Sequence, residues 1–82
     1  MRRNELDICA DILRIAKKGG RKTHLVYRAN LNFNLLKRYV SKLGESGLLE
    51  KEGNYYYTTE RGCEFLERYH GLVGPLKMGF GV

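Results

Sequence analysis

The chain has 82 residues, with 15 Lys and Arg against nine Asp and Glu, which gives a formal charge of +6. This length supports one domain with a single small core, and it excludes a second lobe with a large active-site cleft. The sequence has no apolar run of the roughly 18–20 residues that cross a bilayer, and its cysteines are too few for a disulfide framework. We therefore expect a cytoplasmic domain with reduced thiols, a Cys9–Cys63 bridge being the minority alternative.

The positive charge is concentrated in one stretch of the sequence. Residues 14–42 contain nine Lys and Arg and no Asp or Glu, whereas the rest of the chain contains six basic and nine acidic residues. The stretch therefore carries +9 and the remainder −3. Such a segment predicts a surface for a polyphosphate backbone, because each Lys or Arg contact releases condensed counterions. The alternative is a solvated face that only keeps the protein in solution.

Residues 4–18 predict the first helix. Asn4 is a candidate N-cap, and acidic residues in the first turn with lysines in the last suit the helix dipole. The apolar residues recur at the spacing of one buried stripe. They are Ile8, Cys9, Ile12, Leu13, Ile15 and Ala16. This places Cys9 in the core rather than at a reactive site, and Gly19-Gly20 is interpreted as the stop of the helix.

Two further helices follow. Thr23 is the expected cap of a short second helix, which ends near Asn30, a residue that tolerates the left-handed conformation of a helix C-terminus. Asn32 is the expected cap of the third helix, over residues 33–45.

The third helix has a distinct buried face and polar face. The buried face consists of Leu36, Val40 and Leu43. At about 100° per residue, the opposite face carries Asn34, Arg38 and Ser41, with Lys37 and Lys42 beside them. Phe33 and Tyr39 are expected at the core boundary. Leu35 either packs on the second helix or contacts a base methyl, and packing is the favoured interpretation.

The pattern changes after Gly47. Residues 48–51 and 55–58 are short strand-like runs joined by the turn Glu52-Gly53-Asn54, which predicts a β-hairpin. Thr59 is the expected cap of a fourth helix. The apolar side of that helix consists of Phe65, Leu66 and Tyr69.

The C-terminal residues 71–82 contain four glycines and the only proline of the chain. This composition predicts that the fourth helix ends near His70 and that a loosely held tail follows. We therefore expect a domain over residues 1–70 and a glycine-rich tail over residues 71–82.

Three helices, a two-stranded hairpin and a fourth helix are the order of a winged helix-turn-helix domain, a mostly helical α+β fold. The local sequence strengthens this interpretation. The run Leu31-Asn32-Phe33-Asn34-Leu35-Leu36-Lys37-Arg38-Tyr39-Val40-Ser41-Lys42-Leu43, followed by Gly47-Leu48-Leu49, is similar to the winged-helix signature. In that signature a Leu and a capping Ser or Asn open the recognition helix, and a Gly-Leu step leads into the wing.

The stretch Lys22-Thr23-His24-Leu25-Val26-Tyr27-Arg28-Ala29-Asn30-Leu31-Asn32 resembles the K-T-x-I-M-Y-x-A-N-L-S stretch of small archaeal winged-helix regulators. That group includes the archaeal chromatin proteins of the "10a" type. The run Thr58-Thr59-Glu60-Arg61-Gly62, followed by Phe65-Leu66, resembles the opening of their last helix. The resemblance covers about residues 6–69. It implies binding of double-stranded DNA, with the third helix in the major groove and the hairpin as the wing.

The resemblance also implies a homodimer. The chromatin members of the group dimerise through a long C-terminal coiled-coil helix. This sequence departs from them after His70, where Gly71, Gly74 and Pro75 follow, so a homodimer is expected to use the first and fourth helices instead.

Carried over onto this sequence, the resemblance implies a set of base-facing residues. They are Asn32, Phe33, Asn34, Lys37 and Arg38. The chemistry agrees, because Arg38 matches guanine and Asn34 matches adenine through paired hydrogen bonds. The expected phosphate contacts are Arg21, Lys22, Thr23, Arg28, Ser41, Lys42, Lys51, Asn54 and Tyr55. The start of the second helix offers free amides to a phosphate, whereas the wing, with Lys51 between two glutamates, is expected to contribute only modestly.

Other classes of function are less favoured. The sequence has no nucleophile elbow, phosphate-binding glycine loop or paired carboxylates in an apolar setting, so no enzyme activity, cofactor or small-molecule substrate is expected. Its histidines and cysteines lack paired metal-ligand spacing, and no metal site is predicted. Residues 55–57, three tyrosines, are interpreted as a partly buried strand rather than a stacking platform for single strands.

Two alternatives to a transcription regulator stay open. One is a winged helix that binds other proteins, since this fold serves both purposes, and the other is a non-specific architectural DNA-binding protein. The acid-free basic segment favours DNA over a protein partner, and hence a location on the nucleoid in the cytoplasm.

Overall fold

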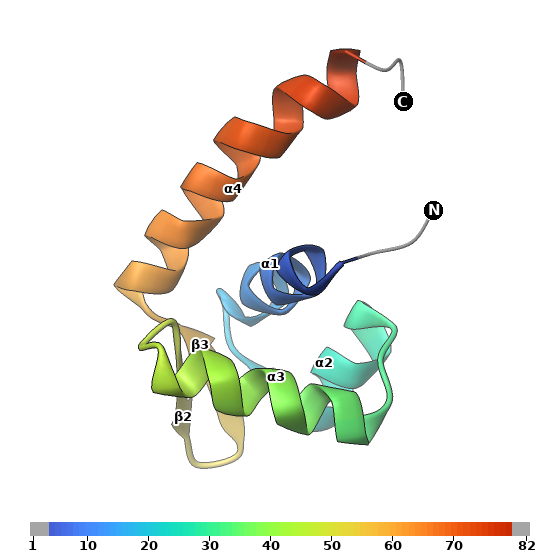
Figure 1. Cartoon of the computed structure of the whole chain (residues 1–82). Helices are drawn as coiled ribbons and strands as arrows, with labels where there is room; N and C mark the ends of the chain where they lie inside the picture. The colour runs from blue at the N-terminus through green and yellow to red at the C-terminus, as the bar shows by residue number, and fades with distance from the viewer. Residues whose placement is uncertain (1–3, 80–82) are drawn as a thin grey trace.

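The structure, a computed structural model, describes residues 4–79, and its description of side chains runs to residue 72. Within these residues the chain forms four helices and one three-stranded sheet (Figure 1). The elements in order are α1 (Glu5–Ala16), β1 (Gly20–Arg21), α2 (Lys22–Ala29), α3 (Phe33–Glu45), β2 (Leu49–Glu52), β3 (Tyr55–Thr58) and α4 (Glu60–Gly79). The predicted fold class, a mostly helical α+β winged helix, is confirmed.

The start of α1 is determined by a capping box. The Asn4 side chain accepts a hydrogen bond from the Asp7 amide at 2.8 Å, and the Asp7 carboxylate accepts one from the Asn4 amide at 3.3 Å. The two bonds satisfy backbone donors that have no partner within the helix. Asn4 is therefore the N-cap, as predicted.

The start of α2 differs from the prediction. Its N-cap is Arg21, which makes no side-chain capping bond, and Thr23 lies inside the first turn. Pairing of β1 with β3 holds Arg21 in an extended conformation, so the helix begins directly after the strand. The predicted cap at Thr23 is wrong because this tertiary pairing outweighs the local capping preference. The predicted helix end is confirmed, since Asn30 has a left-handed φ of 56°.

The bounds of α3 agree with the prediction. The Asn32 side chain accepts a hydrogen bond from the Leu35 amide at 2.7 Å, which confirms Asn32 as the N-cap. Leu36, Tyr39 and Leu43 are the buried residues of this helix, whereas Val40 is half-buried against the core. Tyr39 is thus more deeply buried than Val40, the reverse of the prediction. Phe33 is 52% exposed rather than at the core boundary.

The sheet contains a strand that the sequence did not predict. β1 pairs with β3, and β3 pairs with β2, all antiparallel, in the order β1-β3-β2. Gly19-Gly20 was interpreted only as a helix stop, but Gly20 pairs with Tyr56. Gly19 has φ of 91°, and a Cβ there would lie 2.6 Å from the Tyr57 ring. Glycine is required here both by the backbone conformation and by the close ring.

The fourth helix starts as predicted but extends further. The Thr59 hydroxyl accepts a hydrogen bond from the Gly62 amide at 3.1 Å, which confirms the cap. The backbone of α4 then continues to Gly79, so the prediction of an end near His70 is wrong. Glycine costs about 1 kcal/mol and proline about 3 kcal/mol in a helix interior, which weakens a helix without forbidding it. Residues 80–82 of the predicted tail lie outside the described residues.

One core joins these elements. α1 lies between α4 on one side and α2 with α3 on the other (Figure 1). The fully buried side chains at its centre are Ile12, Leu13, Leu25 and Leu36. Cys9 is half-buried and packs against this core as expected, and both Cys9 and Cys63 are free thiols. No helix in the described part of the chain is both long and apolar enough to span a membrane.

Candidate nucleic-acid interface

The outward face of α3 presents polar and basic side chains. Because Leu36, Tyr39 and Leu43 turn inward, the helical period leaves a second set of residues exposed on the opposite face and its shoulder. They are Asn34, Lys37, Arg38 and Ser41. Leu35 is half-buried and packs against the core, so it belongs to the packing and not to this face.

The side-chain oxygen of Asn32 is already engaged. It accepts the hydrogen bond from the Leu35 amide that caps α3. The amide nitrogen of Asn32 has no such role in the helix cap. Asn32 thus has a structural task at the start of α3, in addition to the base-facing position expected for it.

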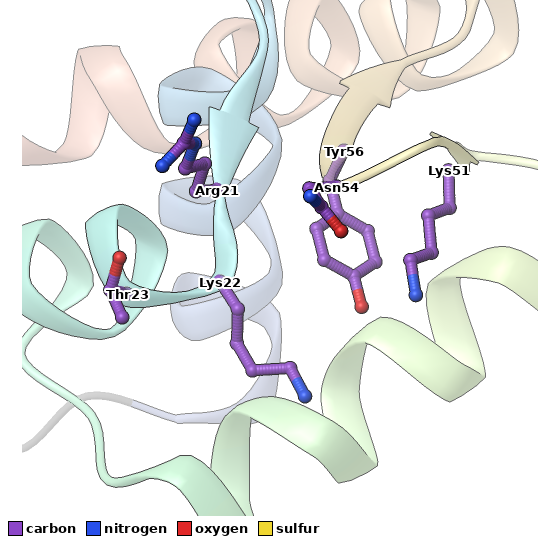
Figure 2. A pocket seen from close by; sticks show the side chains of 6 residues that line it. All are labelled: Arg21, Lys22, Thr23, Lys51, Asn54 and Tyr56. Atoms are coloured by element: carbon purple, nitrogen blue, oxygen red, sulfur yellow. The ribbon is translucent and has the colours of Figure 1, made fainter.

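A basic depression lies between the start of α2 and the hairpin (Figure 2). It has a volume of about 310 Å³. Its lining residues are Arg21, Lys22, Thr23, Lys51, Asn54 and Tyr56. Lys22 and Lys51 point into the same space, whereas the Arg21 side chain points the other way (Figure 2), and the start of α2, which has no side-chain cap, adds backbone donors. A helix N-terminus with nearby cations is suited to an anion such as a phosphate.

The sheet pairs two of the lining cations with neighbouring tyrosines of β3, whose side chains point to opposite faces. β1 pairs Arg21 with Tyr55, and β2 pairs Lys51 with Tyr56. The Arg21 guanidinium lies 5.3 Å from the centre of the Tyr55 ring, and the Lys51 ammonium lies 5.7 Å from that of Tyr56. Each cation thus stands over an aromatic face, an arrangement that orients it while leaving it accessible.

Most of the residues predicted to contact phosphates are brought together here. Arg21, Lys22, Thr23, Lys51 and Asn54 all line the depression. Tyr55 is not one of its lining residues, and its ring lies against the Arg21 guanidinium. Tyr56 also lines the depression but was not among the predicted site residues. The alternation of side chains along a strand was the available signal, but it did not say which of the three tyrosines faces this side.

Lys42 lies apart from this group. Its ammonium group donates to the Glu5 carboxylate of α1 at 3.2 Å, an exposed ion pair. The charge of Lys42 is thereby shared with an acidic partner. Its phosphate contact remains a prediction, as do those of the other residues.

Arg28 lies in a second basic group on the other side of α2. That group lines a separate depression of about 310 Å³ at the end of α1. We call its basic residues the α1–α2 cluster: Arg14, Lys17, Lys18, His24 and Arg28. The +9 segment therefore does not form one patch. Four of its nine cations line this depression, two begin α2, two lie on the outward face of α3, and Lys42 pairs with Glu5.

Two groups with altered titration lie away from these surfaces, where α1 meets its neighbours. The Tyr69 hydroxyl donates a hydrogen bond to the Asp7 carboxylate, and this bond together with burial raises the pKa of Tyr69 to about 12. Burial, with Glu5 nearby, raises the pKa of the Cys9 thiol. Both groups are thus held in their neutral forms, which suits packing rather than chemistry.

Comparison with known proteins agrees with this architecture. The family model for winged helix-turn-helix domains matches residues 2–73, and the chain belongs to this family. It is 31% identical over 72 residues to an uncharacterised protein of Methanocaldococcus jannaschii, an alignment that covers 87% of this chain and 74% of that protein.

Among solved structures, the chain is similar to Sso10a-2, a DNA-binding protein from Sulfolobus solfataricus. The TM-score is 0.85 at 24% identity, over 96% of this chain and 87% of that one. The winged-helix resemblance drawn from the sequence is confirmed, and Sso10a-2 has the same fold.

Proposed function

We propose that the chain binds double-stranded DNA, with α3 in the major groove and the β2–β3 hairpin as a wing against the backbone. The observation that carries this proposal is the basic depression beside α3. Lys22 and Lys51 point into the same space there (Figure 2), beside the start of α2, which has no side-chain cap, and Arg21 lines the same depression. Cations and helix amides position a protein on phosphates, while a helix face with amide and guanidinium groups reads base edges. The solved structure with the same fold belongs to a DNA-binding protein.

In the proposed complex, α3 contacts the bases. Arg38 can contact guanine and Asn34 adenine through paired hydrogen bonds, and Lys37 lies on the shoulder of the same face. Phe33, with 52% of its surface exposed, offers an apolar contact to a thymine methyl. We call the outward face of α3 together with the depression at the start of α2 the α3–wing surface.

Two single substitutions test which residue reads bases and which contacts only phosphates. Arg38→Ala should cost about 1–3 kcal/mol of binding free energy at the preferred sequence and relax the base preference. Lys22→Ala should weaken binding to all sequences alike and reduce the salt slope of log K by about 1. The measurement is a fluorescence-anisotropy titration of the full chain with specific and scrambled duplexes over a salt series. Equal, sequence-independent losses from both variants would contradict the assignment of Arg38.

We further propose a homodimer that uses α1 and α4. The support is apolar surface on these helices, since Leu6 of α1 is 46% exposed and Leu72 of α4 is 72% exposed. The C-terminal part of α4 also extends away from the body of the domain (Figure 1). Sedimentation equilibrium of the full chain gives the mass directly, and a monomer at every concentration up to that used for DNA binding contradicts this part.

A role as a transcription regulator on the nucleoid is the finer part of the proposal. Footprinting on genomic fragments tests it, because a regulator protects a few discrete sites. Uniform protection favours an architectural protein instead, and no protection at any site favours a protein-binding winged helix.

A further inference from the structure

The α1–α2 cluster is not part of the α3–wing surface. At about 100° per residue, His24 and Arg28 lie about 100° and 140° around the axis of α2 from Thr23, which lines the other depression. Tyr27, which is 84% exposed, lines neither depression. The two basic depressions share no lining residue and lie on different sides of α2.

The composition of this cluster is suited to a polyanion. It brings Lys17 and Lys18 from the end of α1 together with Arg28 from α2, and all three side chains are exposed. No acidic side chain lines the depression in the part of the chain that the structure describes. Arg14, at its edge, pairs with Asp11 of its own helix at 3.5 Å. Several cations around one open depression attract a chain of phosphates more than a single charge, because the counterion release adds over contacts.

The position of the cluster indicates which phosphates it meets. A duplex seated on the α3–wing surface lies on one flank of α2, whereas Lys17, Lys18 and Arg28 are on the other flank. The two depressions share no lining residue. A duplex held at the first therefore leaves these three cations for another duplex.

We infer that the α1–α2 cluster is a second phosphate-backbone site, through which a single protomer holds a second duplex segment without reading its sequence. The inference rests on the proposed function, because it takes the α3–wing surface as the first site. It makes each protomer a bridge between two duplexes by itself, whatever its oligomeric state.

The test is a two-duplex capture with the full chain. One duplex is immobilised, a labelled duplex is supplied in solution, and the protein is added at low salt. The test variant is Lys17→Gln/Lys18→Gln/Arg28→Gln, and the matched control, also three exposed cations, is Lys22→Gln/Lys37→Gln/Arg38→Gln. Thermal melting followed by circular dichroism confirms that both variants are folded.

The expected result has two parts. The wild type retains the labelled duplex, whereas the test variant loses this retention and still binds the immobilised duplex with unchanged affinity. With excess duplex, so that both sites of the wild type are occupied, the slope of log K against log salt concentration is steeper for the wild type than for the test variant by about 2.7. This is about 0.9 for each of the three phosphate contacts removed.

Three other results overturn the inference. Full retention by the test variant means that bridging, if any, comes from two α3–wing surfaces in a dimer. A loss of affinity for the immobilised duplex as large as in the control variant means that the cluster belongs to one continuous footprint. Absence of binding by the wild type itself refutes the proposed function, and the second site with it.

Discussion

Two glycines of α4 predict opposite outcomes for the same substitution. Gly62 is buried, and a Cβ there would lie 2.5 Å from the Thr58 methyl group and in direct contact with the carbonyl oxygen of Leu48. That oxygen is held in place, because it accepts a hydrogen bond from the Thr59 amide at 3.0 Å. Gly71, in the same helix, has nothing within 4 Å of the position that a Cβ would take. Gly62 thus permits a close approach of the backbone, whereas Gly71 has no close neighbour.

The magnitudes follow from two opposed effects. Replacing Gly by Ala inside a helix gains about 1 kcal/mol from backbone propensity. At Gly62 the added methyl must displace a hydrogen-bonded backbone carbonyl, so the cost lies at the upper end of the range for overpacking, about 2–3 kcal/mol. Gly62→Ala should therefore lower the free energy of unfolding by about 1–2 kcal/mol, whereas Gly71→Ala should raise it by up to about 1 kcal/mol.

Urea denaturation followed by circular dichroism measures both variants against the wild type. In a domain of this size, 1 kcal/mol corresponds to a Tm shift of roughly 4–8 °C, so thermal melts provide a second readout. The reasoning is refuted if Gly62→Ala is as stable as the wild type. An equal loss in Gly71→Ala would show that α4 needs glycine for a reason other than the contact with Leu48.

Three further predictions concern the helix ends and the contacts of α1. Tyr69→Phe removes the bond to Asp7 and should cost about 1 kcal/mol of stability. Because the pKa of Tyr69 is raised to about 12 in the folded state, the stability from this bond is present below about pH 10 and is lost as the pH approaches 12. The urea midpoints of the wild type and the variant should therefore converge near pH 12. Asn32→Ala should cost about 1 kcal/mol in thermal melts by removing the α3 cap, while Asn32→Ser should recover most of it, and equal losses would contradict the capping role. Glu5→Gln should change stability by less than about 1 kcal/mol, since the pair with Lys42 is exposed, and should raise duplex affinity in the anisotropy titration only if Lys42 contacts phosphate.

The order and type of most elements could be predicted because their signals are local. The cap at Asn32, the left-handed Asn30 before it and the apolar spacing of Leu36 and Leu43 all act within a few residues, and α3 has the predicted bounds. The same holds for Asn4 at the start of α1. The exposed polar face of α3 follows from the same period, so its residues could be named in advance.

The end of α4 could not be placed by composition alone. Gly71 and Pro75 have unfavourable helix propensities, and the sequence therefore predicted a break. The backbone of α4 nevertheless continues to Gly79. A summed propensity is only a weak guide, because each unfavourable residue costs a few kcal/mol at most and a helix already begun adds turns without a new nucleation cost.

By itself, then, the sequence determined the winged-helix order, the caps of α1, α3 and α4, and the presence of a basic region. The tertiary structure alone decided that Arg21 pairs with Tyr55 and begins α2, and that Tyr56 faces the basic depression. It also divided the one basic segment among the two depressions, the outward face of α3 and an ion pair with Glu5. The physical reason is range: caps and helical periods depend on neighbours a few residues away, whereas strand pairing and the grouping of charges depend on how distant segments pack.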